Sequence, residues 1–348
     1  QNYYFLLFVV LNFLCACDDA PTYVGICVEF GESEKYAKID DAVVSESSGL
    51  AISSKHEDLL WTHNDSGGKA QIFALSTKGA DRGILSFGVA EAYDWEAMSL
   101  GPCNSTSCLF VGDIGDNGAL RDSVILWRLE EPEPPGEGRT MIVSPKSVEV
   151  VYPDGAKDSE AMVVDTETGD VILIEKSLSA EANVYRLPSE RWEDGTEEPI
   201  ELELIGTIDF LVDSLTGGMI TGADMAPAGH EIFARTYIAG FHIPITRGQT
   251  RSISGFGEPR LVDVFDDGQC ESVAYAPDGL ALWFTCEEEN APIAKADCET
   301  IEEVSGNLVT VEESSGCAAL GAPQWLGLLA LALLRRRRIS RNSVARHC

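Results

Sequence analysis

Basic residues are scarce in this sequence. Only 25 Lys and Arg stand against 57 Asp and Glu, and the formal net charge of the 348 residues is −32. Six of those 25 basic residues are arginines within residues 335–348, so the rest of the chain is more acidic still. Such a surface repels the phosphates of nucleic acids, which argues against a nucleic-acid partner. It attracts cations, and divalent metals most strongly.

Long amphipathic helix patterns and common catalytic motifs are also missing. The sequence has no G-x-S-x-G, no H-E-x-x-H, no glycine-rich phosphate loop, and no C-x-x-C pair or histidine cluster of zinc type. By contrast, 32 glycines and 15 prolines supply many turns, and 45% of the residues are hydrophobic. This composition favours an all-β fold with a substantial core.

The N-terminal end has the features of an export signal. Residues 1–14 form an apolar run without Met or basic residues, so we expect the natural start of the chain to lie further upstream. The run leads into "LCAC", Leu14 to Cys17, which resembles a bacterial lipobox with Cys17 as the lipidated residue. Ordinary signal-peptidase cleavage is the alternative. We expect residues 1–17 to lie outside the fold.

The C-terminal end combines Cys317, an apolar run over 318–334 and four consecutive arginines. This arrangement resembles the C-terminal sorting signal of myxobacterial surface proteins, whose tail is removed near the cysteine, although "ISRNSVARHC" after the arginines departs from that pattern. A plain C-terminal transmembrane helix is the alternative. We therefore expect residues 313–348 to be a membrane or sorting tail, with the protein anchored at a bacterial cell surface or outer membrane. Residues 22–312 are left for the folded domain.

Between these ends, five segments share one plan: a lead residue, a short apolar strand, a tight turn, a second strand, a polar loop, a third strand and a more variable fourth. Four strands in 40–60 residues is the period of a β-propeller blade. The sequence predicts a single five-bladed β-propeller, with six blades as the alternative. We expect the N-terminal strand around "ICVEF" to complete the last blade and close the ring. The segments are "SGLAISS" from Ser48, "EAMSLGP" from Glu96, "EAMVVDT" from Glu160, "TGADMAP" from Thr221 and "ESVAYAP" from Glu271.

Six of the ten cysteines lie between the two processing segments. An even number in an exported domain suggests three disulfides, although six cysteines allow fifteen pairings. Two of them flank a hairpin turn in the second blade, and two are symmetric about the turn "APDGL" in the fifth. The remaining two lie near the closing strand and at the end of the last third strand. The predicted pairs are Cys103–Cys108, Cys270–Cys286 and Cys27–Cys298.

The lead residues are candidates for a metal site. The first strand of each propeller blade lines the central channel, so Ser48, Glu96, Glu160, Thr221 and Glu271 would lie at one level around its axis. Three converging carboxylates need compensation, and oxygen ligands favour Ca²⁺. The alternatives are Mg²⁺ at the same place, or acids that begin strands and face channel water. Asp94 and Asp158, two residues before two of the glutamates, could support such ligands or merely begin the strands.

The order hydroxyl, Glu, Glu, hydroxyl, Glu at the lead positions resembles two groups of proteins. One is the calcium-centred five-bladed propellers of the calcium-activated nucleotidase (apyrase) type, and the other is bacterial phytase-like or esterase-like propellers. The resemblance spans residues 45–300 but rests on a few residues per blade. It implies the fold, a central Ca²⁺ and a hydrolase. "TGADM" departs from the pattern, since Asp224 could point elsewhere. No stretch matches the catalytic segments, so the catalytic residues are unknown.

The ends of the second strands and their loops are expected at the same face as the lead residues, where they would form a polar mouth, while the opposite turns read as ordinary hairpins. Five polar loops in register predict a ligand-binding face, although each loop taken alone is typical of a turn. His63 could be a general base or an anchor for its turn. A second Ca²⁺ at Asp113, Asp116 and Asn117 is a further hypothesis. The candidate ligand-binding residues are His63, Asn64, Asp65, Asp113, Asp116, Asn117, Glu175, Lys176, Arg235, Tyr237 and Glu287.

These patterns lead to two hypotheses on function. The first is an exported, monomeric surface module that binds an extracellular small molecule, a glycan or a phosphorylated ligand. The second is a Ca²⁺-dependent hydrolase of phosphate esters or anhydrides, which the family resemblance and two cations beside a metal, Lys176 and Arg235, would support.

Overall fold

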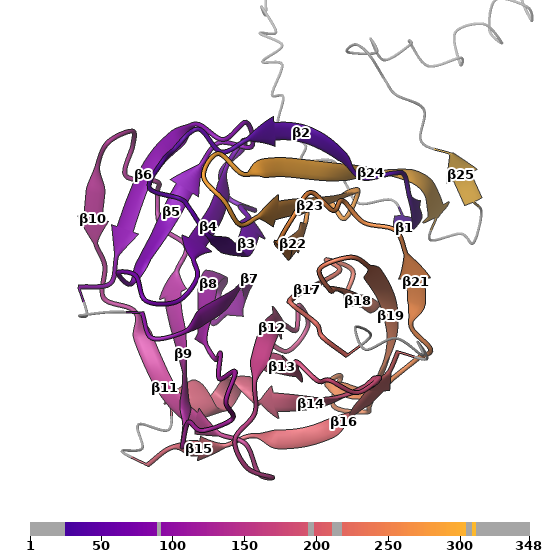
Figure 1. Cartoon of the computed structure of the whole chain (residues 1–348). Coiled ribbons are helices and arrows are strands. Elements are labelled where there is room, and N and C mark those ends of the chain that lie inside the picture. Colours follow the sequence, from indigo (N-terminus) through magenta and orange to yellow (C-terminus); the bar gives the residue numbers. More distant parts are fainter. Residues whose placement is uncertain (1–24, 89–91, 194–197, 211–217, 304–307, 311–348) are drawn as a thin grey trace, which may run out of the picture. The chain divides into compact units, whose positions relative to one another are not determined.

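The computed structural model describes residues 25–88, 92–193, 198–210, 218–303 and 308–310. Within these ranges the chain forms five β-sheets arranged in a ring (Figure 1), and the only helix is the short 3₁₀ helix η1 (Ser189–Glu193). This confirms the predicted all-β, five-bladed propeller rather than six blades. The expected signal and tail segments, with Cys17 and Cys317, lie outside the described residues.

Each blade is one sheet. The first contains β3 (Ser47–Ile52), β4 (Leu60–Asn64), β5 (Gln71–Leu75), β6 (Asp81–Ser86) and β10 (Thr140–Ile142). The second contains β7 (Trp95–Cys103), β8 (Thr106–Asp113), β9 (Val124–Glu130), β11 (Lys146–Val151) and β15 (Ile200–Glu201). The third contains β12 (Ser159–Val164), β13 (Val171–Glu175), β14 (Glu181–Leu187) and β16 (Glu203–Asp209). The fourth contains β17 (Gly222–Met225), β18 (Glu231–Arg235), β19 (Gly240–Arg247), β20 (Ile253–Phe256) and β21 (Arg260–Val262). The fifth contains β22 (Cys270–Tyr275), β23 (Ala281–Cys286), β24 (Pro292–Glu303), β1 (Gly25–Phe30), β2 (Glu34–Lys38) and β25 (Leu308–Thr310).

Among the described residues, only the third blade has the four strands expected of every blade. The additional strands are mostly short and come from the connections: β10 pairs parallel with β6, and β15 pairs parallel with β11. Segments of two or three residues carry no readable alternation of apolar and polar residues, which is why the sequence does not reveal them. In the fifth blade, β1 and β2 both pair antiparallel with β24.

The hydrophobic core is divided among the contacts between neighbouring blades. Five clusters of buried side chains each join residues of two adjacent sheets, from Phe110 with Leu173 between the second and third blades to Phe233 with Phe284 between the fourth and fifth. The inner strands β3, β7, β12, β17 and β22 surround the centre of the ring (Figure 1). The five first strands therefore meet at one channel, as the repeat predicts.

Three disulfides join the pairs that the sequence predicts. Cys103–Cys108 spans the β7–β8 hairpin, Cys270–Cys286 links β22 to β23, and Cys27–Cys298 links β1 to β24. Disulfides are typical of proteins in oxidising compartments outside the cytosol. Over the described part of the chain, none of the helical structure is long and apolar enough for a membrane crossing.

Candidate metal centre and polar mouth

The strand register brings the lead residues and the second-strand loops to the same end of the channel. Opposite the start of each first strand lies the end of the second strand: Ser47 faces Asn64, Trp95 faces Asp113, and Ser159 faces Glu175. The last two blades repeat this arrangement, with Gly222 opposite Arg235 and Cys270 opposite Cys286. The polar mouth of the sequence prediction is thus one end of the channel.

A local irregularity recurs at the lead positions. In four blades the antiparallel register shifts at the lead residue, so that Ser48, Glu96, Glu160 and Glu271 each fall at a β-bulge. A bulged residue leaves the regular pairing and its side chain is redirected, which is common beside functional sites. The fourth lead residue, Thr221, instead precedes β17. All five lead residues are buried, with at most 5% of the glutamate surfaces exposed.

Three carboxylates form a compact cluster at the polar mouth. One oxygen each from Asp65, Asp94 and Glu96 lies within 4.8 Å of the others. Asp65 follows β4, while Asp94 and Glu96 stand immediately before and within the start of β7. We call these three residues the carboxylate cluster. Gly115 lies against it so closely that a β-carbon at this position would be 2.5 Å from both Asp94 Oδ2 and Glu96 Oε1.

The carboxylate cluster has a donor set and a spacing that fit Ca²⁺. Two oxygens bound to one Ca²⁺ lie at most about 5.2 Å apart, twice the longest usual Ca–O distance, so a mutual separation within 4.8 Å is compatible with a shared ion. The cluster contains neither histidine nor cysteine, the usual ligands of Zn²⁺. Asp65 and Asp94 are only half-buried, which leaves room for water to complete a coordination sphere.

Without a bound cation, ionised carboxylates this close together and partly buried cost the folded protein free energy. Burial raises the pKa of Glu96 far above its ordinary value of 4.5, and the charges of Glu160, Asp65 and Asp94 raise it further. Burial and the Asp65 charge raise the pKa of Asp94 to about 6, against the opposing influence of Arg121. A divalent cation would favour the ionised forms of Glu96 and Asp94 against the burial and repulsion that raise their pKa values.

Glu160 is paired with a lysine side chain. Its Oε1 forms an ion pair with Lys176, the residue after β13, and Lys176 also donates to the hydroxyl of Tyr237 at 3.3 Å. Burial still raises the pKa of Glu160, despite Lys176. Burial alone would lower the pKa of Lys176, but the Glu160 carboxylate raises it above its usual range. Glu160 Oε2 is buried and has no hydrogen-bond partner among the described residues.

Glu271 shares its surroundings with another acid. Burial raises the pKa of Glu271, and the nearby Glu287 carboxyl, with which it shares a hydrogen bond, raises it further. Arg235 is fully buried, and its Nε and Nη2 donate to backbone carbonyls. Burial lowers the pKa of Arg235 to about 10, although the Glu271 charge opposes this effect. Within the described residues, Arg235 Nη1 has no hydrogen-bond partner.

The loop proposed for a second Ca²⁺ is held by an arginine. Arg121 Nη2 lies 2.9 Å from Asp113 Oδ1, and the Arg121 backbone N–H donates to Asp116 Oδ2 at 2.7 Å. Asp113 also accepts hydrogen bonds from the backbone amides of Tyr93 and Asp94, so it fixes the segment that carries two members of the carboxylate cluster, Asp94 and Glu96. Asn117 is exposed. The sequence did not indicate Arg121 as a site residue, because Arg121 lies in the loop between β8 and β9, outside the repeated strand pattern.

The other predicted mouth residues have varied surroundings. His63 is completely buried; its Nδ1–H donates to the Asn64 carbonyl, and its ring meets Trp95 edge-on. The Asn64 side chain accepts from the amides of Ser45 and Glu46 and therefore fixes the preceding loop. Glu175 lies 3.7 Å from Lys157 rather than beside the carboxylate cluster. Thr221 and Ser48 donate their hydroxyls to the backbone carbonyls of Glu271 and Glu96, respectively.

Comparisons with known proteins identify no family. No family model matches the sequence, and no curated protein matches it. Among solved structures, an auxiliary nutrient binding protein of Bacteroides thetaiotaomicron is similar over 85% of this chain and 65% of its own, with 11% identity and a TM-score of 0.42. The chain thus spans less than two thirds of that protein's length. Glutaminyl cyclase of Myxococcus xanthus matches over 80% of this chain and 97% of its own, at 10% identity and a TM-score of 0.39. Likenesses of this size support no statement on function.

Proposed function

We propose that this protein is an exported surface module that binds Ca²⁺ at the polar mouth of its propeller and uses the loaded mouth to bind an extracellular ligand. The observation that carries the proposal is the carboxylate cluster, in which oxygens of Asp65, Asp94 and Glu96 lie within 4.8 Å of one another. The buried, unpartnered Oε2 of Glu160 supports a cation in the same channel. Burial and neighbouring charges raise the pKa of Glu96, and Ca²⁺ binding would ionise this carboxyl.

The chemistry around the metal favours an anionic or hydroxyl-rich ligand. Ca²⁺ bound by half-buried carboxylates would keep open positions that water or ligand oxygens can occupy. Lys176 and Tyr237 at the same mouth offer an ammonium and a phenol group, and burial raises the pKa of Tyr237 to about 12, so the phenol stays protonated. A phosphorylated compound or a glycan with a carboxylate fits these partners.

A metal-dependent melt tests the calcium site. The purified full chain is stripped with EGTA, and its thermal unfolding is followed by circular dichroism with EGTA, with Ca²⁺ or with Mg²⁺. Ca²⁺ at about one hundred times its dissociation constant adds roughly 2.7 kcal/mol to the free energy of unfolding, so the melting temperature should rise clearly. Mg²⁺ should have a smaller effect because it demands a tighter octahedral geometry. An unchanged melt in Ca²⁺ contradicts the proposal.

The same preparation separates binding from catalysis. Binding of inorganic phosphate, a phosphorylated sugar and a uronic-acid oligosaccharide is measured by calorimetry with and without Ca²⁺. A Ca²⁺-dependent heat without product supports the binding module. Ca²⁺-dependent release of phosphate from p-nitrophenyl phosphate or a nucleoside triphosphate would assign the alternative, a hydrolase in which Lys176 stabilises the charge on the phosphate.

We further propose that the N-terminal segment closes the ring and that the termini anchor the protein to a membrane. The pairing of β1 and β2 with β24 and the Cys27–Cys298 disulfide support closure. The apolar run before Cys17 and the Cys317–arginine tail support the anchors. Mass spectrometry of the protein from its native membrane would reveal a lipid on Cys17 and processing at Cys317. An unprocessed, water-soluble chain would contradict the anchors.

A further inference from the structure

A cavity lies at the opposite end of the channel from the polar mouth. Its volume is about 310 Å³, within the range of small-molecule sites. Glu96 is the second residue of β7, whereas Leu100 and Pro102 near the end of the same strand line this cavity. At about 3.3 Å per residue, the two regions are separated by roughly 13–20 Å along the strand. We call this second space the distal cavity.

All five blades contribute to the wall of the distal cavity. Ile52 and Leu100 come from the ends of β3 and β7, and Tyr275 ends β22. Thr166 comes from the turn after β12, and Pro102, Pro227 and Pro277 come from the hairpin ends that the sequence presents as ordinary turns. The lining is therefore mainly apolar, with a few hydroxyl groups.

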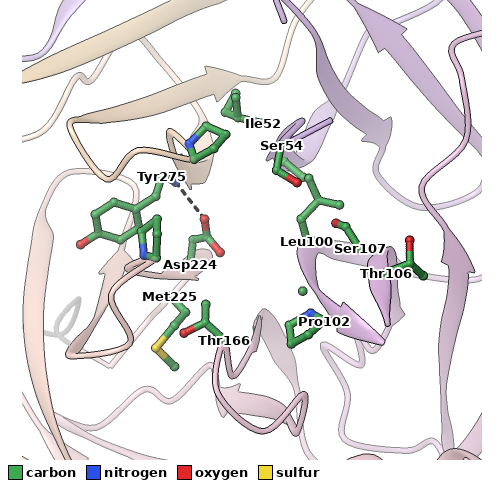
Figure 2. Close-up of a pocket in the computed structure, with 14 residues that line it drawn as sticks. Ile52, Ser54, Leu100, Pro102, Thr106, Ser107, Thr166, Asp224, Met225 and Tyr275 are labelled. Carbon is green, nitrogen blue, oxygen red and sulfur yellow. Dashed lines mark hydrogen bonds between the residues drawn. The ribbon is translucent and has the colours of Figure 1, made fainter. Parts of the chain in front are cut away.

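One carboxylate stands on this wall. Figure 2 shows Asp224 of β17 beside Tyr275 and across the cavity from Leu100 and Pro102. Its Oδ2 accepts the Tyr275 backbone N–H at 2.8 Å, and its Oδ1 accepts the Ser99 hydroxyl at 3.4 Å. In the described part of the chain, Asp224 forms no ion pair. The Met225 backbone amide also donates to this carboxylate. A carboxylate offers about four acceptor positions, so Asp224 can still accept a hydrogen bond from a ligand.

We propose that the distal cavity is a second ligand site, which takes a small organic cation: an ammonium group on a compact apolar body. The ammonium would bind the Asp224 carboxylate, and the apolar body would pack on Leu100, Pro102 and Met225. Charge complementarity supports this class, since Asp224 is the only acidic or basic side chain among the described residues that line the cavity, and the protein as a whole is strongly acidic. An ion pair shielded from water by apolar walls is stronger than one at the surface.

A buried network fixes the wall that holds Asp224. The Tyr275 hydroxyl donates to Glu231 Oε1 at 2.8 Å, and His242 Nδ1 lies 2.9 Å from the same oxygen. This network ties β22 to β18 and β19 behind the cavity. Because Tyr275 also donates its backbone N–H to Asp224, the carboxylate is held in place before any ligand arrives. Such preorganisation lowers the entropy cost of binding.

Three probes that share one body but differ in charge test the site. Benzylammonium, benzyl alcohol and benzoate are titrated into the full chain loaded with Ca²⁺, at about pH 8, where the amine is protonated and Asp224 is ionised. Binding is measured by calorimetry and located by the ¹³C resonance of the methionine methyl groups. We expect benzylammonium to bind at least tenfold more tightly than benzyl alcohol, with no binding of benzoate. The Met225 methyl resonance should shift, while that of Met141 on the outer strand β10 should not.

Two variants locate the charge that is recognised. Asp224→Asn keeps the shape and the acceptor for the Tyr275 amide, so it should fold and should lose the tenfold preference for benzylammonium. Glu175→Gln removes a carboxylate at the polar-mouth end of β13, beside Lys157 and outside the carboxylate cluster, and should leave benzylammonium binding within twofold. Equal affinity for benzylammonium and benzyl alcohol overturns the proposal. A tenfold preference for benzylammonium that survives in Asp224→Asn, or that disappears in Glu175→Gln, overturns it as well, because Asp224 would then not be the charge that is recognised.

Discussion

The pH dependence of stability without calcium follows from the buried carboxyls of the polar mouth. Burial is the main cause that raises the pKa of Glu96, Glu160 and Glu271 above the ordinary value of 4.5. Between the unfolded and folded pKa values, the folded state binds a proton that the unfolded state has released. The free energy of unfolding therefore falls as pH rises through that interval, which is the reverse of the usual behaviour of ion-paired acids.

The size of the effect depends on how many of the three carboxyls keep their protons in the fold. Each such carboxyl lowers the free energy of unfolding by about 1.4 kcal/mol per pH unit. Because the groups interact, they titrate in sequence, so the slope lies between about 1.4 and about 4 kcal/mol per pH unit. Even the lower value removes about 3 kcal/mol over two units, a large part of a typical stability of about 5–15 kcal/mol.

Urea unfolding in EGTA, followed by tryptophan fluorescence between about pH 5.5 and 7.5, measures this slope. We expect the midpoint to fall steadily with pH in EGTA and to fall less steeply in Ca²⁺, because bound Ca²⁺ keeps Glu96, the one of these three carboxyls that belongs to the carboxylate cluster, ionised in the folded state. Glu96→Gln cannot titrate at that position, so it should make the slope in EGTA shallower. A midpoint in EGTA that stays constant or rises with pH would refute this account of the polar mouth.

Three further predictions concern separate parts of the molecule. Gly115→Ala should weaken Ca²⁺ binding at least tenfold in a competition assay with a fluorescent chelator, because the new β-carbon would displace both neighbouring carboxylates. The control Gly68→Ala, whose β-carbon would meet nothing within 4 Å, should bind Ca²⁺ as the unmodified chain does. Equal Ca²⁺ affinities of the two variants would show that the packing of Gly115 does not constrain the site. Replacing both Cys27 and Cys298 with Ser should lower the free energy of unfolding by about 2–4 kcal/mol in urea, and an unchanged midpoint would show that the disulfide does not constrain the ring. Benzylammonium affinity should fall as pH drops below about 7, since burial raises the pKa of Asp224 to about that value, and affinity independent of pH there would speak against an ionised Asp224.

The first strand of each blade could be predicted because the same pattern of residues recurs five times along the sequence. Each lead residue is followed by a short apolar strand and a turn, and this pattern alone located β3, β7, β12, β17 and β22. The disulfides followed from the same layout, since Cys270 and Cys286 face each other once the β22–β23 hairpin is in register. Short-range patterns of this kind depend on neighbouring residues, so they are readable without a structure.

The partners within the polar mouth could not be predicted in the same way. The strand plan places all lead residues at one level, but it does not reveal that Asp94 and Asp65 approach Glu96 or that Lys176 pairs with Glu160. These contacts depend on side-chain directions at β-bulges and on loop conformation. The distal cavity was missed for a similar reason, because Asp224 and the hairpin prolines meet only when five blades surround one axis.

The central claim is that the carboxylate cluster binds Ca²⁺, and calorimetric titration of Ca²⁺ into the stripped full chain tests it most directly. We predict saturable binding to the unmodified chain and at least a tenfold loss of affinity in the double variant Asp94→Asn, Glu96→Gln. The matched control Glu175→Gln, whose carboxylate lies near Lys157 instead, should bind as the unmodified chain does. No binding heat with the unmodified chain, or equal affinity in the double variant, would contradict the claim.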